Sequence, residues 1–434
     1  MIAKTRRIKD TPELTHELSS VTLPAPKFVY LPVTNARCGK GEVSVKEGDK
    51  VYLGEKIGVR HAAFFDQPIH STVSGTVRGI EKHGYRNGKI VDCIKIENDF
   101  QDTPDPAAHP RTEEEAMALT REQVVEIIKE KSLVGLGGSS FPTYVKMNVK
   151  PGTKIDVILI NGIECEPYLT TDQRTMMEKP YEIIKGIQIL ENIFDCHDAR
   201  ICIKGIHREC VEKMDEVLKD FPDSGIRVDL MDNYYPQGWE TAMIKKSTGR
   251  VVKHGELPPQ HGVFNVNVAT AEGIYEAVYM DRPVYERLMS VNGNGIAHPA
   301  NLTVRVGTLL SEVVAACGGY LGDTPKRLVL GGPMMGQCVP FDDCVCSKTV
   351  TSLLVLEDRK IEELPCVRCG SCVLSCPAHL EPVSIMNAVK AMNKEAIKKL
   401  NPLECIECGL CSYSCTSGIR VTDYVKRAKI FARM

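Results

Sequence analysis

Long apolar runs and an excess of charge of one sign are both missing from this chain of 434 residues. No stretch approaches the ~18 uninterrupted apolar residues that a membrane helix needs, so we expect no membrane-spanning segment. Lys and Arg total 54 against 56 Asp and Glu, which gives a net charge of -2. Without a basic excess there is little to attract the phosphates of nucleic acids, and we expect no nucleic-acid partner.

The N-terminus also lacks the features of a secretory signal. Met1–Asp10 is basic, but no apolar segment and no small-residue cleavage site follow it, which predicts a cytoplasmic protein. Cysteine, by contrast, is abundant. Of 18 cysteines, those between Cys366 and Cys415 form a regular cluster while the others are scattered. This clustering favours metal ligation over disulfides.

The chain is long enough for about three domains of ~150 residues, and its patterning suggests four units. Short alternating runs of Val, Ile and Thr between glycine turns predict an all-β unit over about Lys27–Glu97. After a polar linker, Thr120–Gln123 has a capping-box pattern that opens a helix over Val124–Lys131. Apolar β-type runs such as Ile155–Ile160 then alternate with amphipathic stretches such as Tyr181–Ile193. That alternation is typical of an α/β unit with a largely parallel sheet.

The last part of the chain changes character twice. Residues 303–336 predict a small β-rich unit, with a helix over Leu309–Cys317 and a strand over Lys326–Leu330. The tail from Leu364 is helical outside its cysteine loops. We place the four units at 1–110, 111–295, 296–358 and 359–434.

The tail carries two copies of the spacing C-x-x-C-x-x-C-x-x-x-C. This spacing is that of ferredoxin-type [4Fe-4S] ligands, in which three cysteines of one loop bind one cluster and the fourth reaches the other. The expected ligand sets are Cys366, Cys369 and Cys372 with Cys415, and Cys405, Cys408 and Cys411 with Cys376. Two zinc knuckles are the alternative, but zinc sites use four ligands in separated pairs. We therefore predict two iron–sulfur clusters.

A glycine-rich loop, Gly135–Thr143, precedes Lys146, so backbone N–H groups and one ammonium can converge on a phosphate. An ordinary connection in an α/β unit is the alternative. The strand Ile155–Ile160 ends in the polar segment Asn161–Tyr168, and ligands of open α/β sheets bind at such strand ends. Two more polar clusters follow, Tyr235–Thr241 and Val266–Thr270.

In this order, these four segments resemble the NADH- and FMN-binding subunit of respiratory complex I. The resemblance implies a flavin and phosphate loop made by Gly135, Gly137, Gly138 and Lys146. It places Asn161, Glu164 and Glu166 near the isoalloxazine and nicotinamide, with Tyr235, Gly238, Glu240, Asn267 and Thr270 as the remaining wall and Phe141 near the NADH adenine. It further implies that Glu166 is the catalytic residue that contacts the nicotinamide nucleotide. The sequence departs from that pattern at Leu136, Ile163 and Trp239.

Over about Lys27 to the C-terminus, the chain is similar to the RnfC family, whose members are subunits of the Rnf ion-translocating ferredoxin:NAD+ oxidoreductase. That similarity implies a multidomain α/β and α+β fold with four parts. These are an N-terminal barrel-sandwich hybrid, a Rossmann-like complex-I flavoprotein domain, a β-grasp SLBB domain around Arg305–Gly336 and a C-terminal two-cluster ferredoxin-like helical domain. The carrier lysine motif of lipoyl domains is missing from the first unit, so we interpret it as a scaffold.

The similarity implies a flavo-iron-sulfur enzyme subunit that oxidises NADH, or reduces NAD+, at FMN. Its two clusters would relay single electrons to or from partner subunits or ferredoxin, with the protein peripheral on the cytoplasmic face of the cell membrane. The alternative is a soluble electron-transfer protein that serves a cytoplasmic reductase such as proline reductase, without ion translocation. Two other hypotheses are an adaptor that has lost nicotinamide binding, suggested by Ile163 and Trp239, and a metal-stabilised scaffold.

Overall fold

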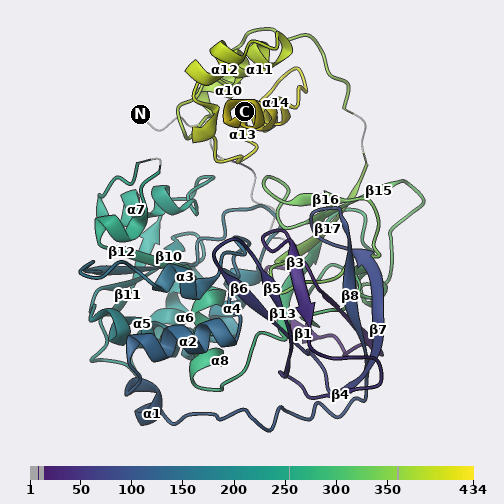
Figure 1. Cartoon of the computed structure of the whole chain (residues 1–434). Helices are drawn as coiled ribbons and strands as arrows, with labels where there is room; N and C mark the ends of the chain where they lie inside the picture. Colours follow the sequence, from purple (N-terminus) through teal and green to yellow (C-terminus); the bar gives the residue numbers. More distant parts are fainter. Residues whose placement is uncertain (1–7, 9–13, 254, 359–360) are drawn as a thin grey trace.

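The computed structural model describes residues 8, 14–253, 255–358 and 361–434. Figure 1 shows an α/β unit and two β-rich units side by side, with the C-terminal helical unit, in yellow, lying above them. No helix in these ranges is long and apolar enough to span a membrane. The four parts implied by the sequence are present, and the multidomain fold class is confirmed.

The first unit is built from two small antiparallel sheets. One has the order β2-β8-β7-β4 and the other β3-β5-β6. Their strands are β2 (Phe28–Pro32), β3 (Lys40–Val43), β4 (Lys50–Val51), β5 (Lys56–His61), β6 (Asp66–His70), β7 (Gly75–Gly84) and β8 (Ile90–Asn98). Alternate side chains such as Val29, Ile57 and Ile94 meet between the sheets and are fully buried. This is the expected barrel-sandwich arrangement.

The second unit has a parallel sheet in the order β11-β10-β9-β12, which confirms the expected parallel pairing. The strands are β9 (Val157–Asn161), β10 (Ala199–Lys204), β11 (Ile226–Met231) and β12 (Val263–Asn267). The chain builds outward from β9 to β11 and then returns to the other side of β9 as β12. The strand order therefore reverses between β9 and β12, and ligands of open α/β sheets bind where the order reverses.

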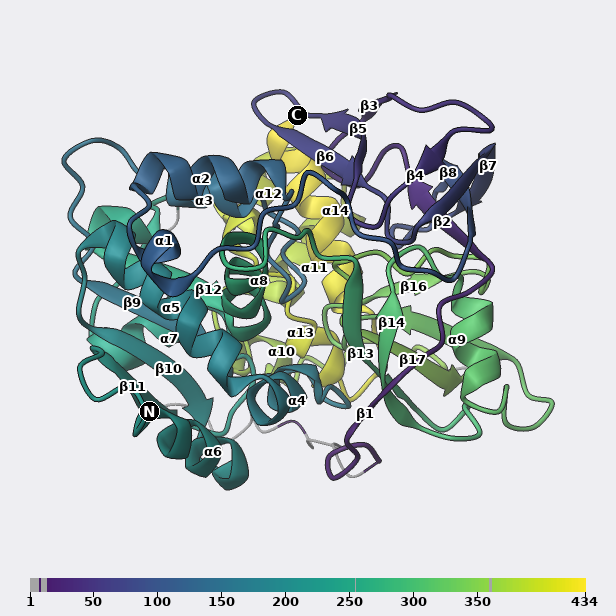
Figure 2. The same cartoon turned by 90° about the horizontal axis from the view of Figure 1, so that it is seen from below.

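Helices cover both faces of this sheet (Figure 2). They are α1 (Glu113–Met117), α2 (Arg121–Glu130), α3 (Thr143–Met147), α4 (Thr171–Glu178), α5 (Pro180–Phe194), α6 (Arg208–Leu218), α7 (Glu240–Thr248), the 3-10 helix η2 (Pro258–His261) and α8 (Val268–Val278). The capping box at Thr120 forms as predicted, because its hydroxyl accepts from the Gln123 N–H while the Gln123 side chain accepts from the Thr120 N–H.

The third unit has one mixed sheet in the order β1-β14-β13-β17-β15-β16. Its elements are β1 (Ser20–Thr22), β13 (Glu286–Asn292), β14 (Ala300–Arg305), α9 (Leu310–Ala316), β15 (Lys326–Leu330), β16 (Gln337–Val339) and β17 (Ser352–Glu357). β13 lies within the 111–295 range that we assigned to the second unit, yet it pairs with β14 and β17. β1 comes from the N-terminus and extends the sheet by parallel pairing with β14.

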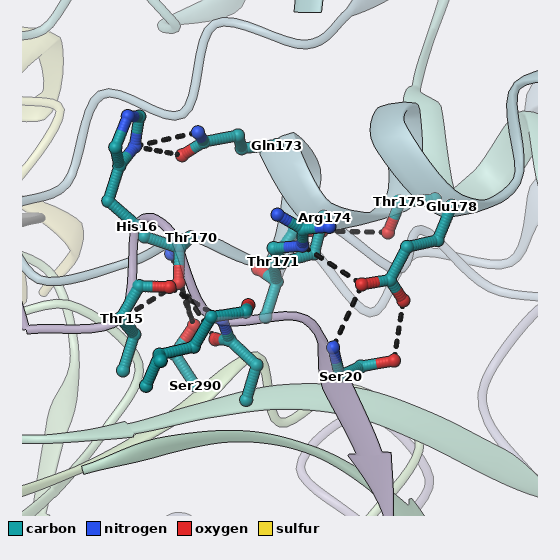
Figure 3. Close-up of polar contacts among 12 residues, drawn as sticks. Thr15, His16, Ser20, Thr170, Thr171, Gln173, Arg174, Thr175, Glu178 and Ser290 are labelled. Carbon is teal, nitrogen blue, oxygen red and sulfur yellow. Dashed lines mark hydrogen bonds and ion pairs between the residues drawn. The ribbon is translucent and has the colours of Figure 1, made fainter. Parts of the chain in front are cut away.

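The same N-terminal segment also holds α4 in place (Figure 3). Thr15 Oγ1 lies 2.9 Å from Thr170 Oγ1, and the Ser20 backbone N–H donates to Glu178 at 2.8 Å. His16 Nδ1 lies 2.7 Å from Gln173 Nε2. These contacts fix both ends of α4 against the sheet of the third unit, which matters because α4 begins at the functional cleft.

The C-terminal unit consists of α10 (Ser371–Leu374), α11 (Pro382–Lys390), α12 (Lys394–Lys399), the 3-10 helix η3 (Pro402–Glu404), α13 (Leu410–Tyr413) and α14 (Val421–Arg433). Its two cysteine loops repeat one backbone conformation. Gly370 and Gly409, just before α10 and α13, have φ of +77° and +78°, and Arg368 and Glu407 have φ of +57° and +59°. The repeated left-handed residues turn each loop tightly, as the duplicated spacing suggests.

Candidate functional site

A large cleft opens at the carboxyl ends of β9 and β12, where the strand order reverses. Its empty volume is about 1610 Å³, part of which is open to solvent. The predicted cofactor residues that line it are Gly137, Gly138, Asn161, Glu164, Glu166, Gly238, Glu240 and Asn267. Four segments that are far apart in the sequence therefore meet around one space, and this space is large enough for a flavin and a second small molecule.

The glycine loop forms one side of the cleft. A Cβ on Gly137 would lie 2.8 Å from Asn267 Cγ, so only glycine lets the loop approach the end of β12 this closely. Gly138 has φ of +98°, and a Cβ there would meet no protein atom within 4 Å. The loop backbone is thus open to the cleft at Gly138, as close approach to a phosphate requires.

The other predicted residues support the cleft from outside. Thr270 Oγ1 accepts from the Leu136 N–H at 3.0 Å, and the Gly135 N–H donates to the Phe141 carbonyl at 2.8 Å. Lys146 Nζ lies 3.0 Å from Glu240 Oε1, so its ammonium reaches the cleft through that carboxylate. The Phe141 ring lies outside the lining, beneath the Arg37 guanidinium at 5.5 Å from the ring centre.

Glu164 is held at the start of α4. Its carboxylate accepts from the backbone N–H groups of Asp172 and Gln173 at 2.9 and 3.1 Å. Burial and the neighbouring Asp172 charge raise the pKa of Glu164. Asp172 also lines the cleft and accepts from Asn267 Nδ2 at 2.8 Å. The pair therefore adds a proton-holding acidic group to the floor of the cleft.

Glu166 connects the second unit to the third. Its carboxylate accepts from the Met334 N–H at 3.0 Å and lies 3.5 Å from the Tyr235 hydroxyl. A Cβ on Gly332 would meet this carboxylate at 2.1 Å, so the glycine loop of the third unit closes tightly over it. Burial raises the pKa of Glu166 to about 7.

The raised pKa of Glu166 gives a pH dependence of stability. A carboxyl group whose folded-state pKa rises from 4.5 to about 7 stabilises the fold below 4.5, and that contribution is lost as pH rises through 7. Glu166→Gln is neutral at every pH, so relative to wild type it should gain about 2 kcal/mol of unfolding free energy between pH 5 and 8. Chemical denaturation at pH 5 and pH 8 measures this, and an equal difference at both would contradict it.

Glu191 provides a matched control. It is a buried glutamate of α5 that accepts from the Gly225 N–H at 3.1 Å, and burial raises its pKa to about 7 as well. It does not line the cleft. Glu191→Gln should therefore show the same pH dependence of stability without any effect on cofactor chemistry.

The predicted cysteine sets come together in the C-terminal unit. One cavity, of about 360 Å³, is lined by an inner set consisting of Cys376, Cys405, Cys408 and Cys411. A second, of about 810 Å³, is lined by an outer set consisting of Cys366, Cys369, Cys372 and Cys415. Each cavity thus combines three cysteines of one loop with the fourth of the other. Four converging thiols are the ligands that an iron–sulfur cluster requires.

The inner set lies directly beside the cleft. The Tyr235 hydroxyl donates to the Cys408 carbonyl at 2.9 Å, and Ile406 lines the cleft itself. Cys408 is buried, whereas Cys366 and Cys369 of the outer set are exposed. The two sets therefore lie in series, with one next to the cleft and the other at the surface.

Several cleft residues have no strong signal in the sequence. Arg86, in the β7–β8 turn, lines the cleft and donates to Ser140 Oγ at 3.0 Å. Asp172 follows a Thr-Thr pair at a helix start, a weak signal that a helix-capping search can find. Of the departures from the complex I pattern, Leu136 and Ile163 are core residues, and Trp239 lies at the cleft.

Four family models match the chain in the order of the structural units. They describe an RnfC barrel sandwich hybrid domain over residues 7–101, a Nuo51 FMN-binding domain over 128–276, an SLBB domain over 289–337 and a 4Fe-4S dicluster domain over 359–416. The chain is therefore a modular flavin and iron–sulfur protein.

Relatives over most of the chain define the family. The RnfC-type subunit of a sodium-translocating ferredoxin:NAD(+) oxidoreductase complex from Acetobacterium woodii is 33% identical over 83% of this chain and 81% of the relative. Its counterpart in a proton-translocating complex from Clostridium ljungdahlii is 33% identical over 83% and 78% of the two chains. The chain belongs to the RnfC family, whose members are subunits of ion-translocating oxidoreductase complexes.

A solved structure shares the fold. The match is to an NAD+-reducing [NiFe]-hydrogenase in the H2-reduced state, with a TM-score of 0.51 and 15% identity. It covers 73% of this chain and 61% of the hydrogenase chain. At this identity the likeness concerns the fold alone.

Proposed function

We propose that this chain oxidises NADH, or reduces NAD+, at FMN in the cleft and exchanges single electrons with partner proteins through its cysteine sets. When bound, FMN exchanges hydride with a nicotinamide nucleotide, and [4Fe-4S] clusters carry one electron at a time. The chain's own residues supply binding, orientation and a dry connection between the cofactors.

The proximity of the inner cysteine set to the cleft carries this proposal. Ile406 lines the cleft one residue after Cys405, and Tyr235 spans from the Cys408 carbonyl to Glu166. A metal-stabilised scaffold has no need to bury a ligand loop against a cofactor cleft. The series of cleft, inner set and exposed outer set is instead the order that electron transfer between a flavin and an external protein requires.

The residues divide into two groups by position. Gly137 and Gly138 present their backbone toward the cleft, and we assign them with Lys146 to the FMN phosphate. Asn161 and Asn267, at the ends of the two central strands, are assigned to the flavin ring side. Glu166 is assigned to the nicotinamide nucleotide, where it would fix the geometry of hydride transfer.

The exposed outer set suggests where partners dock. The relatives are subunits of ion-translocating complexes, so we assign other subunits of such a complex as partners, at the cytoplasmic face of the membrane. Ferredoxin or a soluble reductase would use the same exposed cysteine loop. In each case the partner receives or donates its electrons near Cys366 and Cys369.

Rapid mixing of the flavin- and cluster-loaded protein with NADH tests the function. Flavin should bleach first, followed by the clusters. Glu166→Gln should slow flavin bleaching by ~10- to 1000-fold, the loss expected when orientation at the reacting centre is relaxed, while FMN and iron stay bound. Glu191→Gln should bleach at the wild-type rate. A wild-type protein that holds both cofactors but does not react with NADH would instead support the electron-transfer adaptor.

A further inference from the structure

A second cavity lies where three units meet. Its empty volume is about 700 Å³, and its lining comes from the first unit, from Val134 and Ser140 of the glycine-loop region, and from the 347–349 segment of the third unit. We call it the junction cavity. Thr349 lines both it and the cleft, so the two spaces are neighbours.

The junction cavity is lined by four basic side chains, Arg37, Arg60, His70 and Lys348. Arg60 is only 8% exposed, and its Nε and Nη2 both donate to the Pro32 carbonyl, at 2.9 and 2.6 Å. Its Nη1 has no protein partner within the described ranges. Lys348 Nζ donates to the Ser132 carbonyl at 2.6 Å and to its hydroxyl at 3.2 Å. The His70 ring likewise has no hydrogen-bond partner among the described residues.

None of these four basic groups forms a salt bridge within residues 14–253, 255–358 and 361–434. Other buried cations of the chain do, as Lys185 pairs with Glu113 and Arg305 with Asp102. A buried cation without an anion is costly, and chains retain one rarely. Burial and the Arg60 charge lower the pKa of Lys348 to about 7, and burial together with Lys348 lowers that of His70. The cavity is thus short of negative charge.

We propose that the junction cavity binds a small organic phosphate. A phosphoryl group carries up to two charges and several acceptor oxygens, which suits a guanidinium and an ammonium that converge from different units. A single carboxylate would neutralise only one of them. The rest of the wall is apolar and includes Leu31, Ile69, Val284 and Val306, which gives the organic part of the ligand a place to bury.

The site goes beyond electron transfer, and its position gives it a route to the cleft. Arg86 lines the cleft and donates to Ser140 Oγ at 3.0 Å and to Thr349 Oγ1 at 2.8 Å. Both acceptors line the junction cavity. A ligand there contacts the same loop that carries Gly137 and Gly138.

Titration calorimetry on the full chain, loaded with flavin and clusters, tests the proposal with two probes, inorganic phosphate and phenyl phosphate. Each should bind saturably at one site per chain, and phenyl phosphate should bind more tightly because its ring is buried. Lys348→Met should weaken both by about tenfold or more, the loss expected for one charge-assisted hydrogen bond. The matched control is Lys89→Met, an exposed lysine of the β7–β8 turn, which should bind as wild type does.

Thermal unfolding separates lost binding from lost folding. Without phosphate, Lys348→Met should melt at the wild-type temperature or above it, because it removes an unpaired cation. Phosphate should raise the melting temperature of wild type but not of Lys348→Met. Arg60→Lys, which keeps the charge and loses the planar fork, should also weaken binding. Equal affinities of Lys348→Met and Lys89→Met, no saturable binding by wild type, or displacement of phosphate by NADH would each overturn the proposal.

Discussion

Replacing Gly138 by valine is expected to abolish flavin binding while leaving the iron content unchanged. Gly138 lines the cleft, and a side chain there would touch no protein atom within 4 Å. The valine would therefore project into the space that we assign to FMN and keep the phosphate away from the loop N–H groups. Flavin released on denaturation, measured per chain by fluorescence, should fall from about one to about zero.

The strain of a left-handed valine needs its own control, because Gly138 has φ of +98°. Gly152 has φ of +80°, also has no neighbour within 4 Å of its Cβ position, and lies in an exposed turn before β9. Gly152→Val carries a similar backbone cost of about 1–2 kcal/mol but lies outside the cleft. Flavin loss in both variants would indicate destabilisation, and full flavin in Gly138→Val would refute the assignment of the loop.

Cys369→Ala is expected to halve the iron content, from about eight to about four per chain, with flavin still bound. Cys369 lines the outer cavity together with Cys415, which belongs to the other cysteine loop. Cys415→Ala should therefore remove the same cluster. Electron paramagnetic resonance of the reduced protein should show the same remaining signal in both variants.

Double variants make the crossed ligand sets a sharp test. Cys369→Ala with Cys415→Ala should lose no more iron than either alone, because both serve one cluster. Cys369→Ala with Cys376→Ala should lose all of it, since Cys376 lines the inner cavity. Cys338→Ala, an exposed cysteine of β16 that lies outside both cavities, should keep full iron. The opposite pattern would mean that each loop binds its own cluster.

The order of the sites along the molecule gives these variants different consequences. Loss of the outer cluster should leave reduction of flavin by NADH intact, because the inner set remains beside the cleft. Transfer to an external one-electron acceptor should slow, because the exposed loop of Cys366 and Cys369 is the proposed exit. Steady-state reduction of such an acceptor, compared with the rate of flavin bleaching, separates the two steps.

Local patterns in the sequence were enough for the elements and for the metal loops. The capping box at Thr120 and the strand–helix alternation from β9 to α5 depend on residues a few positions apart, so short windows reveal them. The cysteine spacing is equally local, because three thiols of one tight loop must face one small space. Resemblance then identified the glycine loop and the polar strand ends as parts of one cleft.

Only the tertiary structure decided how distant segments meet. β1 pairs with β14, Arg86 reaches the cleft from the first unit, and Tyr235 donates to the carbonyl of Cys408. The junction cavity likewise joins Arg60 of the first unit to Lys348 of the third. No short-range pattern encodes such contacts, because they depend on how complete units pack against one another. The sequence by itself thus determined the units and the cysteine loops, and packing determined that the cleft, the cysteine sets and the junction cavity adjoin.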